Sequence, residues 1–357
     1  MPVVSVVIPA YNASRYVAQT LRSVCDQTLD DIEVIVVDDG STDETAAIVA
    51  GFCERDARVR LLSQPNSHAG VARNRGMAEA SGEYLYFLDA DDLVERTALA
   101  TMVEGARSCD ADVVVCRSRK LDVRTGATEG IYYALRDWPL RTPLTQEQVA
   151  QTLFRSVVGW PWDKLFRREF VAAHGLEFQS LRSTNDAYFV FVAMALARTT
   201  YCVPEVLVTH RVNDSSSVSN TRGASWDNSL IAARAIGQRL RDEGIYGLFE
   251  RTYLNWCVNF TKWNVDTLDD ASAARLVGDA RELLTGVPLD EGFYFLKEDC
   301  EFARLFAQGA DELVFTAARQ AKELRNARRL YSSWPYRLAM RLARPLRFVA
   351  YRVLRRT

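Results

Sequence analysis

Two short acidic segments hold the side chains of this sequence that are best suited to chemistry. Asp38 and Asp39 follow one apolar run, and Asp89, Asp91 and Asp92 follow another. Carboxylates so close together repel one another unless a cation lies among them. Carboxylate oxygens suit Mn²⁺ or Mg²⁺, and the sequence has no cluster of histidines and cysteines that would favour zinc. The pattern indicates a metal site that would bind a diphosphate, with solvated turns or helix caps as the alternative interpretation.

The apolar runs before these segments predict strands of a parallel sheet. Short runs rich in Val, Ile and Leu alternate with amphipathic stretches over the first 116 residues, as expected for strands buried on both faces. Strict alternation of strands and helices implies right-handed crossovers. Strands are expected at residues 3–8, 33–37, 59–62, 84–88 and 112–116, and helices at 14–27, 43–55, 70–80 and 95–108.

The loops that follow these strands should share one edge of the sheet. In parallel α/β sheets, ligands bind beyond the carboxyl ends of the strands. Residues 9–12, 38–41 and 89–92 are therefore expected to line one rim.

The rest of the chain changes character twice. Residues 121–219 are irregular, with a helix expected near 186–197 and a strand near 200–209, and would complete the sheet and build the acceptor side. Residues 225–329 are helix-like throughout. We expect a catalytic domain over 1–220, a helical domain over 221–330 and a basic amphipathic segment over 331–357.

Four segments, in their order and spacing, resemble the inverting family 2 glycosyltransferases of the GT-A fold. They are residues 4–12 (Val-Ser-Val-Val-Ile-Pro-Ala-Tyr-Asn), 37–43 (Val-Asp-Asp-Gly-Ser-Thr-Asp), 72–76 (Ala-Arg-Asn-Arg-Gly) and 82–92 (Gly-Glu-Tyr-Leu-Tyr-Phe-Leu-Asp-Ala-Asp-Asp). The resemblance covers roughly the first 220 residues. It implies a Rossmann-like, mostly parallel sheet flanked by helices, a nucleotide-sugar donor that is most often a UDP-sugar, and Mn²⁺ or Mg²⁺.

The same resemblance implies a donor site on the rim. Ala10, Tyr11 and Asp39 would line the nucleoside pocket, with Tyr11 stacked on the base and Asp39 accepting a hydrogen bond from it. Asp89 would lie by the ribose, and Asp91 would bind the metal under the diphosphate. The alternatives are a packed turn aromatic for Tyr11 and a helix cap for Asp39.

Two arginines complete the donor site that the resemblance implies. Arg73 would offset phosphate charge, the alternative being a residue on a helix surface. Arg211 lies in a polar segment, 210–217, that would fold over the donor and reach the diphosphate through Arg211 or a serine hydroxyl. An exposed polar loop without a function is the alternative. His210 is expected to orient or pack rather than to bind metal.

Sugar transfer with inversion also needs a base for the acceptor hydroxyl. In the family this base follows a Trp-x-Lys-Leu-Phe segment, here residues 162–166, and lies at the start of a helix. Asp186 is the expected base, and Asn185 stands where the family commonly has Glu. A helix cap is the alternative for Asp186. Trp160 and Trp162 would stack on acceptor sugars or pack in the core.

The net charge of −2 conceals an uneven distribution. Residues 319–357 hold twelve Lys and Arg but one acid, a charge of +11, which leaves −13 on residues 1–318. Residues 331–357 are amphipathic, which favours a location in an anionic membrane interface, with a terminal helix packed on the body as the alternative. The acidic cleft argues against a nucleic-acid partner.

These features lead to a functional expectation. The seven cysteines are scattered without a CxxC pair, and neither a signal peptide nor a membrane span is expected, which favours a cytoplasmic protein at the inner face of the plasma membrane. We expect an inverting glycosyltransferase that extends a cell-surface glycan or lipid-linked acceptor. The alternatives are an inactive binding or scaffold module and a sugar nucleotidyltransferase, whose glycine-rich basic loop is missing after the first strand. The motif of NAD-dependent oxidoreductases is missing there as well.

Overall fold

The three-dimensional structure is a computed structural model that describes most of the chain. It describes residues 1–131, 135, 137–214, 218–309, 311–317 and 320. The basic segment expected over 331–357 lies outside the described residues, so its helical form stays a prediction.

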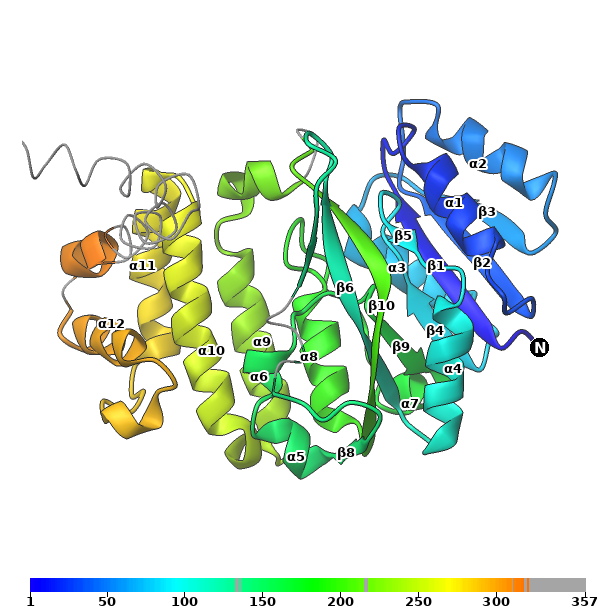
Figure 1. The fold of residues 1–357 in the computed structure, drawn as a ribbon. Coiled ribbons are helices and arrows are strands. Elements are labelled where there is room, and N and C mark those ends of the chain that lie inside the picture. The colour runs from blue at the N-terminus through cyan, green and yellow to red at the C-terminus, as the bar shows by residue number, and fades with distance from the viewer. Residues whose placement is uncertain (132–134, 136, 215–217, 310, 318–319, 321–357) are drawn as a thin grey trace, which may run out of the picture.

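A single mixed sheet forms the centre of the molecule (Figure 1). Its strand order is β3-β2-β1-β4-β9-β6-β10-β5, with β7 beside β6 and β8 beside β10. β1 pairs in parallel with β2 and β4, β2 with β3, and β6 with β10. The strands are β1 Val4–Ala10, β2 Ile32–Asp38, β3 Val59–Ser63, β4 Tyr84–Phe87, β5 Leu93–Val94, β6 Val113–Asp122, β7 Thr128–Gly130, β8 Pro143–Thr145, β9 Lys164–Arg167 and β10 Thr199–Val212.

The mostly parallel sheet predicted from the sequence is confirmed, but the short strands β5, β7, β8 and β9 were missed. β9 runs antiparallel to both β4 and β6 and separates them. Sequence analysis treated this stretch as irregular because it is four residues long and begins with a charged residue, Lys164. A short strand with a charged residue carries too weak a pattern to be recognised.

Helices cover both faces of the sheet because side chains alternate along each strand. Val6 and Ile8 of β1 pack in the apolar cluster that includes α1 (Val17–Cys25), α2 (Thr45–Cys53) and α4 (Ala98–Ser108). Val7 faces the other side, where α8 (Ala187–Leu196) packs. α3 (His68–Ala78) lies on that face too, and so close that a Cβ atom at Gly76 would come within 2.4 Å of Val7.

The described residues from 218 onward are mainly helical, as expected for 225–329. Beyond α8 lie α9 to α12, on one side of the sheet (Figure 1). The apolar cluster of the α8 face continues into them without a break, so the division into domains at residue 220 stays a prediction. No helix in the described part of the chain combines the length and apolar character that a membrane crossing requires. The remaining helices are α5 Gln146–Ala150, α6 Leu153–Ser156, α7 Arg168–Ala173, α9 Asn228–Asp242, α10 Tyr246–Thr267, α11 Asp270–Leu284 and α12 Lys297–Ala307, with 3-10 turns at Val218–Ser225 and Glu291–Phe293.

Candidate active site

The first two loops of the rim are joined by hydrogen bonds. Asn12 donates from its backbone N–H to Ser41 Oγ at 2.9 Å, and its Oδ1 accepts from the backbone N–H of Thr42 at 2.8 Å. Ala10, the last residue of β1, accepts from the backbone N–H of Asp39 at 2.8 Å. The loops after β1 and β2 therefore form one rigid edge, as their positions after parallel strands predicted.

The two side chains expected to hold the nucleoside differ in exposure. Tyr11 is 52% exposed, so it is not the packed aromatic of the alternative interpretation. Asp39 is buried and accepts from Gln64 Nε2 at 2.7 Å and from the backbone N–H of Ser67 at 2.9 Å. Those partners lie in the loop before α3, so Asp39 does not cap α2. The donor contacts of Tyr11, Asp39 and Ala10 stay predictions.

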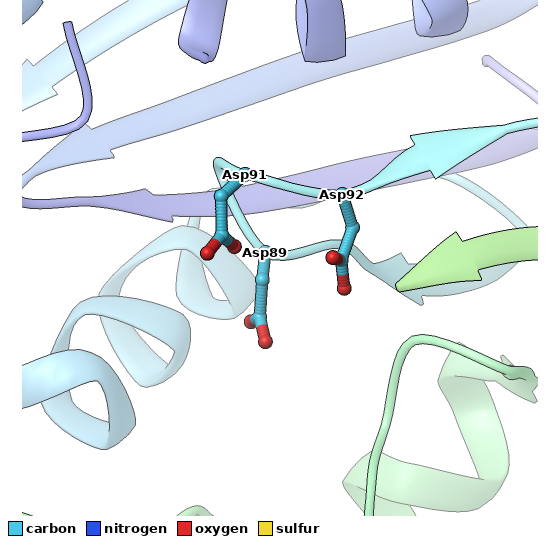
Figure 2. Close-up of side chains that lie close together, drawn as sticks. All are labelled: Asp89, Asp91 and Asp92. Atoms are coloured by element: carbon cyan, nitrogen blue, oxygen red, sulfur yellow. The ribbon is translucent and has the colours of Figure 1, made fainter. Parts of the chain in front are cut away.

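The acidic residues after β4 form a compact cluster. Ligand oxygens of Asp89, Asp91 and Asp92 lie within 4.8 Å of one another (Figure 2). Asp92 is buried and accepts from His210 Nδ1 at 2.9 Å and from the backbone N–H of Arg211 at 2.9 Å. Asp91 differs, because no hydrogen bond or ion pair engages its carboxylate within the described residues.

The electrostatics of this cluster favour a cation beside Asp91. Burial raises the pKa of Asp91 to about 7, and the carboxylates of Asp92 and Asp89 act in the same direction. Burial also raises the pKa of Asp92, against the effect of His210. Burial disfavours the charged form of His210, but the carboxylate of Asp92 outweighs it and raises the pKa of the imidazole to about 9. A bound divalent cation would relieve the repulsion that these carboxylates share.

Arg73 connects the acidic cluster with the segment that holds the expected base. Its side chain is 5% exposed. One guanidinium nitrogen forms an ion pair with Asp89 at 2.5 Å, and the other donates to Asn185 Oδ1 at 2.8 Å. Phe178 lies under the guanidinium, with its ring centre 5.3 Å away. Arg73 is therefore buried and not a residue of the helix surface. The amide oxygen of Asn185 accepts a hydrogen bond from its guanidinium. The contact of Arg73 with a phosphate stays a prediction.

Asp186 precedes α8 but does not cap it. The side chain makes no capping hydrogen bond. Burial raises its pKa to about 6, Arg73 opposes this, and Asp89 adds to it. A carboxylate with a pKa near neutrality, which no other described residue engages by a hydrogen bond, is suited to accept a proton. The helix-cap interpretation is therefore not what the structure shows, while the catalytic role of Asp186 stays a prediction.

Arg211, at the end of β10, is bound by residues of the protein itself. Its guanidinium donates to the carbonyl oxygen of Asp91 and, at 2.5 Å, to Gln19 Oε1. It also lies over the ring of Tyr16 at 4.8 Å. These contacts fasten the end of β10 to the acidic loop. Ser215–Ser217 lie outside the described residues, so the contact of this segment with a diphosphate stays a prediction.

The sequence analysis left the roles of the tryptophans open and overlooked a buried ion pair. Trp162 is 1% exposed and belongs to the core, whereas Trp160 is partly exposed. Lys164 and Asp163, both buried, form an ion pair at 2.5 Å beneath this segment. The charged pair within Trp-Asp-Lys-Leu-Phe was the available signal, but a sequence does not show which charges are buried.

Comparison with known proteins gives one consistent result. The sequence model of Glycosyl transferase family 2 matches residues 5–174. EpsH of Bacillus subtilis, named as a glycosyltransferase, is 32% identical over 235 residues, or 64% of this chain and 66% of that protein. The cholesterol galactosyltransferase of Borreliella burgdorferi is 26% identical over 263 residues, or 72% of this chain and 73% of that protein.

A solved structure has the same fold. TarS of S. aureus, residues 1–349 in complex with UDP-GlcNAc, superposes with a TM-score of 0.67 at 19% identity, covering 90% of this chain and 92% of the other. The chain spans slightly less than two thirds of EpsH, at 66% of its length. Together with the strand order and the acidic cluster after β4, these matches show that residues 5–174 form a domain of glycosyl transferase family 2 and that the chain has the GT-A fold.

Proposed function

We propose that the protein is an inverting glycosyltransferase. It would move a sugar from a nucleotide-diphosphate donor, a UDP-sugar, to a hydroxyl of a glycan or lipid-linked acceptor in cell-surface polysaccharide synthesis. The observation that carries this proposal is the bridge made by Arg73 between Asp89 and Asn185. It ties the residue before Asp186 to the acidic cluster, so one site would contain both a base and a diphosphate-binding group.

The donor would lie along the rim. The exposed ring of Tyr11 is free to stack on a nucleobase. Gln64 and Ser67 both donate to Oδ1 of Asp39, so its Oδ2 would accept the hydrogen bond from the base. The UDP-GlcNAc complex of TarS, a protein of the same fold, supports a UDP-sugar as the donor. Asp89 and Asp91 would face the ribose and the diphosphate.

Asp186 would act on the acceptor. As the acceptor oxygen forms a bond to C1 of the sugar, the bond from C1 to the diphosphate oxygen breaks and the nucleoside diphosphate leaves with that electron pair. Asp186 takes the hydroxyl proton and becomes a neutral carboxylic acid. Attack opposite the leaving group inverts the configuration at C1.

A divalent cation fits the residues present. Asp91 offers a carboxylate without a hydrogen-bonded donor, and Asp89 lies within 4.8 Å of it. Asp92 is already engaged by His210 and the backbone of Arg211, so it would contribute less. A bound Mn²⁺ or Mg²⁺ would stabilise the negative charge of the diphosphate group.

The test is a screen of nucleotide-sugars with Mn²⁺ and a panel of simple glycosides, followed by NMR of the product. We expect transfer from a UDP-sugar, an anomeric configuration opposite to that of the donor, and loss of transfer in the presence of EDTA. Retention of configuration would contradict the inverting mechanism. The absence of any donor binding would support an inactive scaffold module instead.

We also propose that the basic end brings the enzyme to the inner face of the plasma membrane. Its support is the charge of +11 on residues 319–357, at roughly 1 kcal/mol of attraction per basic residue near an anionic leaflet. Deleting residues 334–357 should release the protein from phosphatidylglycerol vesicles and leave its thermal unfolding unchanged. Equal sedimentation of both forms with the vesicles would place the membrane contact elsewhere.

A further inference from the structure

The segment Gly159–Trp160 contacts both parts of the proposed site. The indole ring centre of Trp160 is 5.6 Å from that of His210, the residue bonded to Asp92. Its chain neighbour Gly159 packs against the start of α8, where a Cβ atom at Gly159 would come within 3.1 Å of Ala187 Cα. Trp160 therefore lies next to a partner of the acidic cluster, and its chain neighbour Gly159 lies next to the residue after Asp186.

A rigid base lies beneath this partly exposed indole. The ring of Trp162 stacks on that of Trp160, with centres 4.9 Å apart and planes inclined by 19°. Trp162 is itself 1% exposed, and its carbonyl oxygen accepts from Tyr86 OH at 2.6 Å. The carbon–hydrogen face of a sugar ring packs well against a rigid aromatic surface of this kind.

Lys164 holds the segment that carries Trp160. Its ammonium group is fully buried and donates to the carbonyl oxygens of Val158 at 3.1 Å and Trp160 at 2.7 Å, and it pairs with Asp163 at 2.5 Å. The three donors of the ammonium group are thus all used. Burying an ion pair costs several kcal/mol of desolvation, so this arrangement stabilises the fold little. What it provides is a fixed position for residues 158–160.

We propose that Trp160 is the platform on which the acceptor sugar packs and that Lys164 is a positioning residue that acts through it. The proposal rests on the proposed transferase activity and adds the acceptor side to it. A purely structural Trp160 would cover Trp162 and make no contact with the acceptor.

The test uses as its probe the UDP-sugar and p-nitrophenyl glycoside pair that the wild-type protein converts. Trp160→Ala should raise the KM for the glycoside about tenfold, while kcat, the donor KM and the slow hydrolysis of the UDP-sugar change less than about twofold. Trp160→Phe should restore most of the affinity. Trp263→Ala, which removes a 45% exposed tryptophan from α10, is the matched control and should change none of these values.

Lys164 is tested with its partner removed, so that no unpaired charge stays buried. The variant Asp163→Asn/Lys164→Met should raise the glycoside KM as Trp160→Ala does, and adding it to Trp160→Ala should raise the KM no further. Additive effects would contradict positioning through Trp160.

Other outcomes separate this inference from the proposed function. An unchanged glycoside KM in Trp160→Ala, or equal losses in kcat and in both KM values, would overturn the platform and leave the transferase intact. A wild-type protein that binds no nucleotide-sugar would overturn the proposed function, and the platform with it.

Discussion

The acidic loop after β4 and the loop before α8 each hold one carboxylate that no other residue in the described part of the chain engages by a hydrogen bond or ion pair, Asp91 and Asp186 respectively. Burial raises both pKa values, to about 7 for Asp91 and to about 6 for Asp186. Their surroundings differ in sign. The largest charge effect on Asp91 comes from the carboxylate of Asp92, with His210 opposing it, whereas the largest on Asp186 comes from the guanidinium of Arg73, with Asp89 opposing it. Two aspartates are therefore suited to different partners: Asp91 to a cation and Asp186 to a proton.

This difference shows how one site can assign separate roles to chemically identical groups. Arg73 contacts Asp89 and Asn185 and so fixes the two loops relative to each other. Other described residues donate hydrogen bonds to the carboxylates of Asp38, Asp39 and Asp92. These three carboxylates therefore have a mainly structural role. The division predicts that changes at Asp91 and Asp186 will have distinct consequences.

The largest effect is expected at the base. Asp186→Asn keeps the size of the side chain but cannot accept the acceptor proton, so kcat should fall about 10³-fold with little change in donor KM. Steady-state kinetics with varied donor measure both values. A variant with near-normal kcat would remove Asp186 from the chemistry.

The next effect concerns the cation. Asp91→Asn replaces the carboxylate that no donor engages by an amide, a weaker ligand for Mn²⁺, and should raise the Mn²⁺ concentration at half-maximal activity about 100-fold. Titrating Mn²⁺ at saturating donor gives this value, with Asp186→Asn as the control for a change of charge in the same site. An unchanged Mn²⁺ requirement would place the cation elsewhere.

A smaller effect is expected in the pH dependence of kcat. Asp186 accepts a proton only when it is ionised, so kcat should rise with pH through about 6, rather than through the ordinary 3.8 of an aspartate. Below that midpoint the rate should drop about tenfold per pH unit. A pH profile of kcat at saturating Mn²⁺ and donor shows the midpoint, and a flat profile between pH 5 and 7 would contradict the raised pKa of the base.

The smallest effect is on stability. Because folding raises the pKa of Asp186, its contribution favours the folded state below the unfolded value of 3.8 and is lost as pH rises through about 6. Asp186→Asn should therefore raise the free energy of unfolding at pH 8 by on the order of 1 kcal/mol relative to wild type. Urea unfolding at pH 8 and pH 5 measures the difference. A gain of equal size at both pH values would assign the effect to packing.

The sequence was sufficient to predict the first half of the fold. Near-continuous apolar runs identified β1 to β4, and the positions of Asp39 and Asp91 after those runs placed them on one rim. The motif spacing also placed Asp186 at the start of a helix, as α8 confirms. These features depend on neighbours within a few residues along the chain, which a sequence pattern records.

The features that could not be predicted depend on distant partners. Arg73 bonds Asn185, 112 residues further along the chain, so nothing near it in the sequence indicates that it is buried. The ammonium group of Lys164 is stable inside the protein because it binds the carboxylate of Asp163 and the carbonyl oxygens of Val158 and Trp160. Burial of a charge is decided by such tertiary contacts.

The central claim, that Asp91 serves the cation and Asp186 the proton, is tested most directly by calorimetric titration of UDP with and without Mn²⁺. Asp186→Asn should bind UDP with wild-type affinity and keep the full gain from Mn²⁺, whereas Asp91→Asn should lose that gain. Equal losses in both variants, or an undiminished gain in Asp91→Asn, would contradict the division of roles between the two carboxylates.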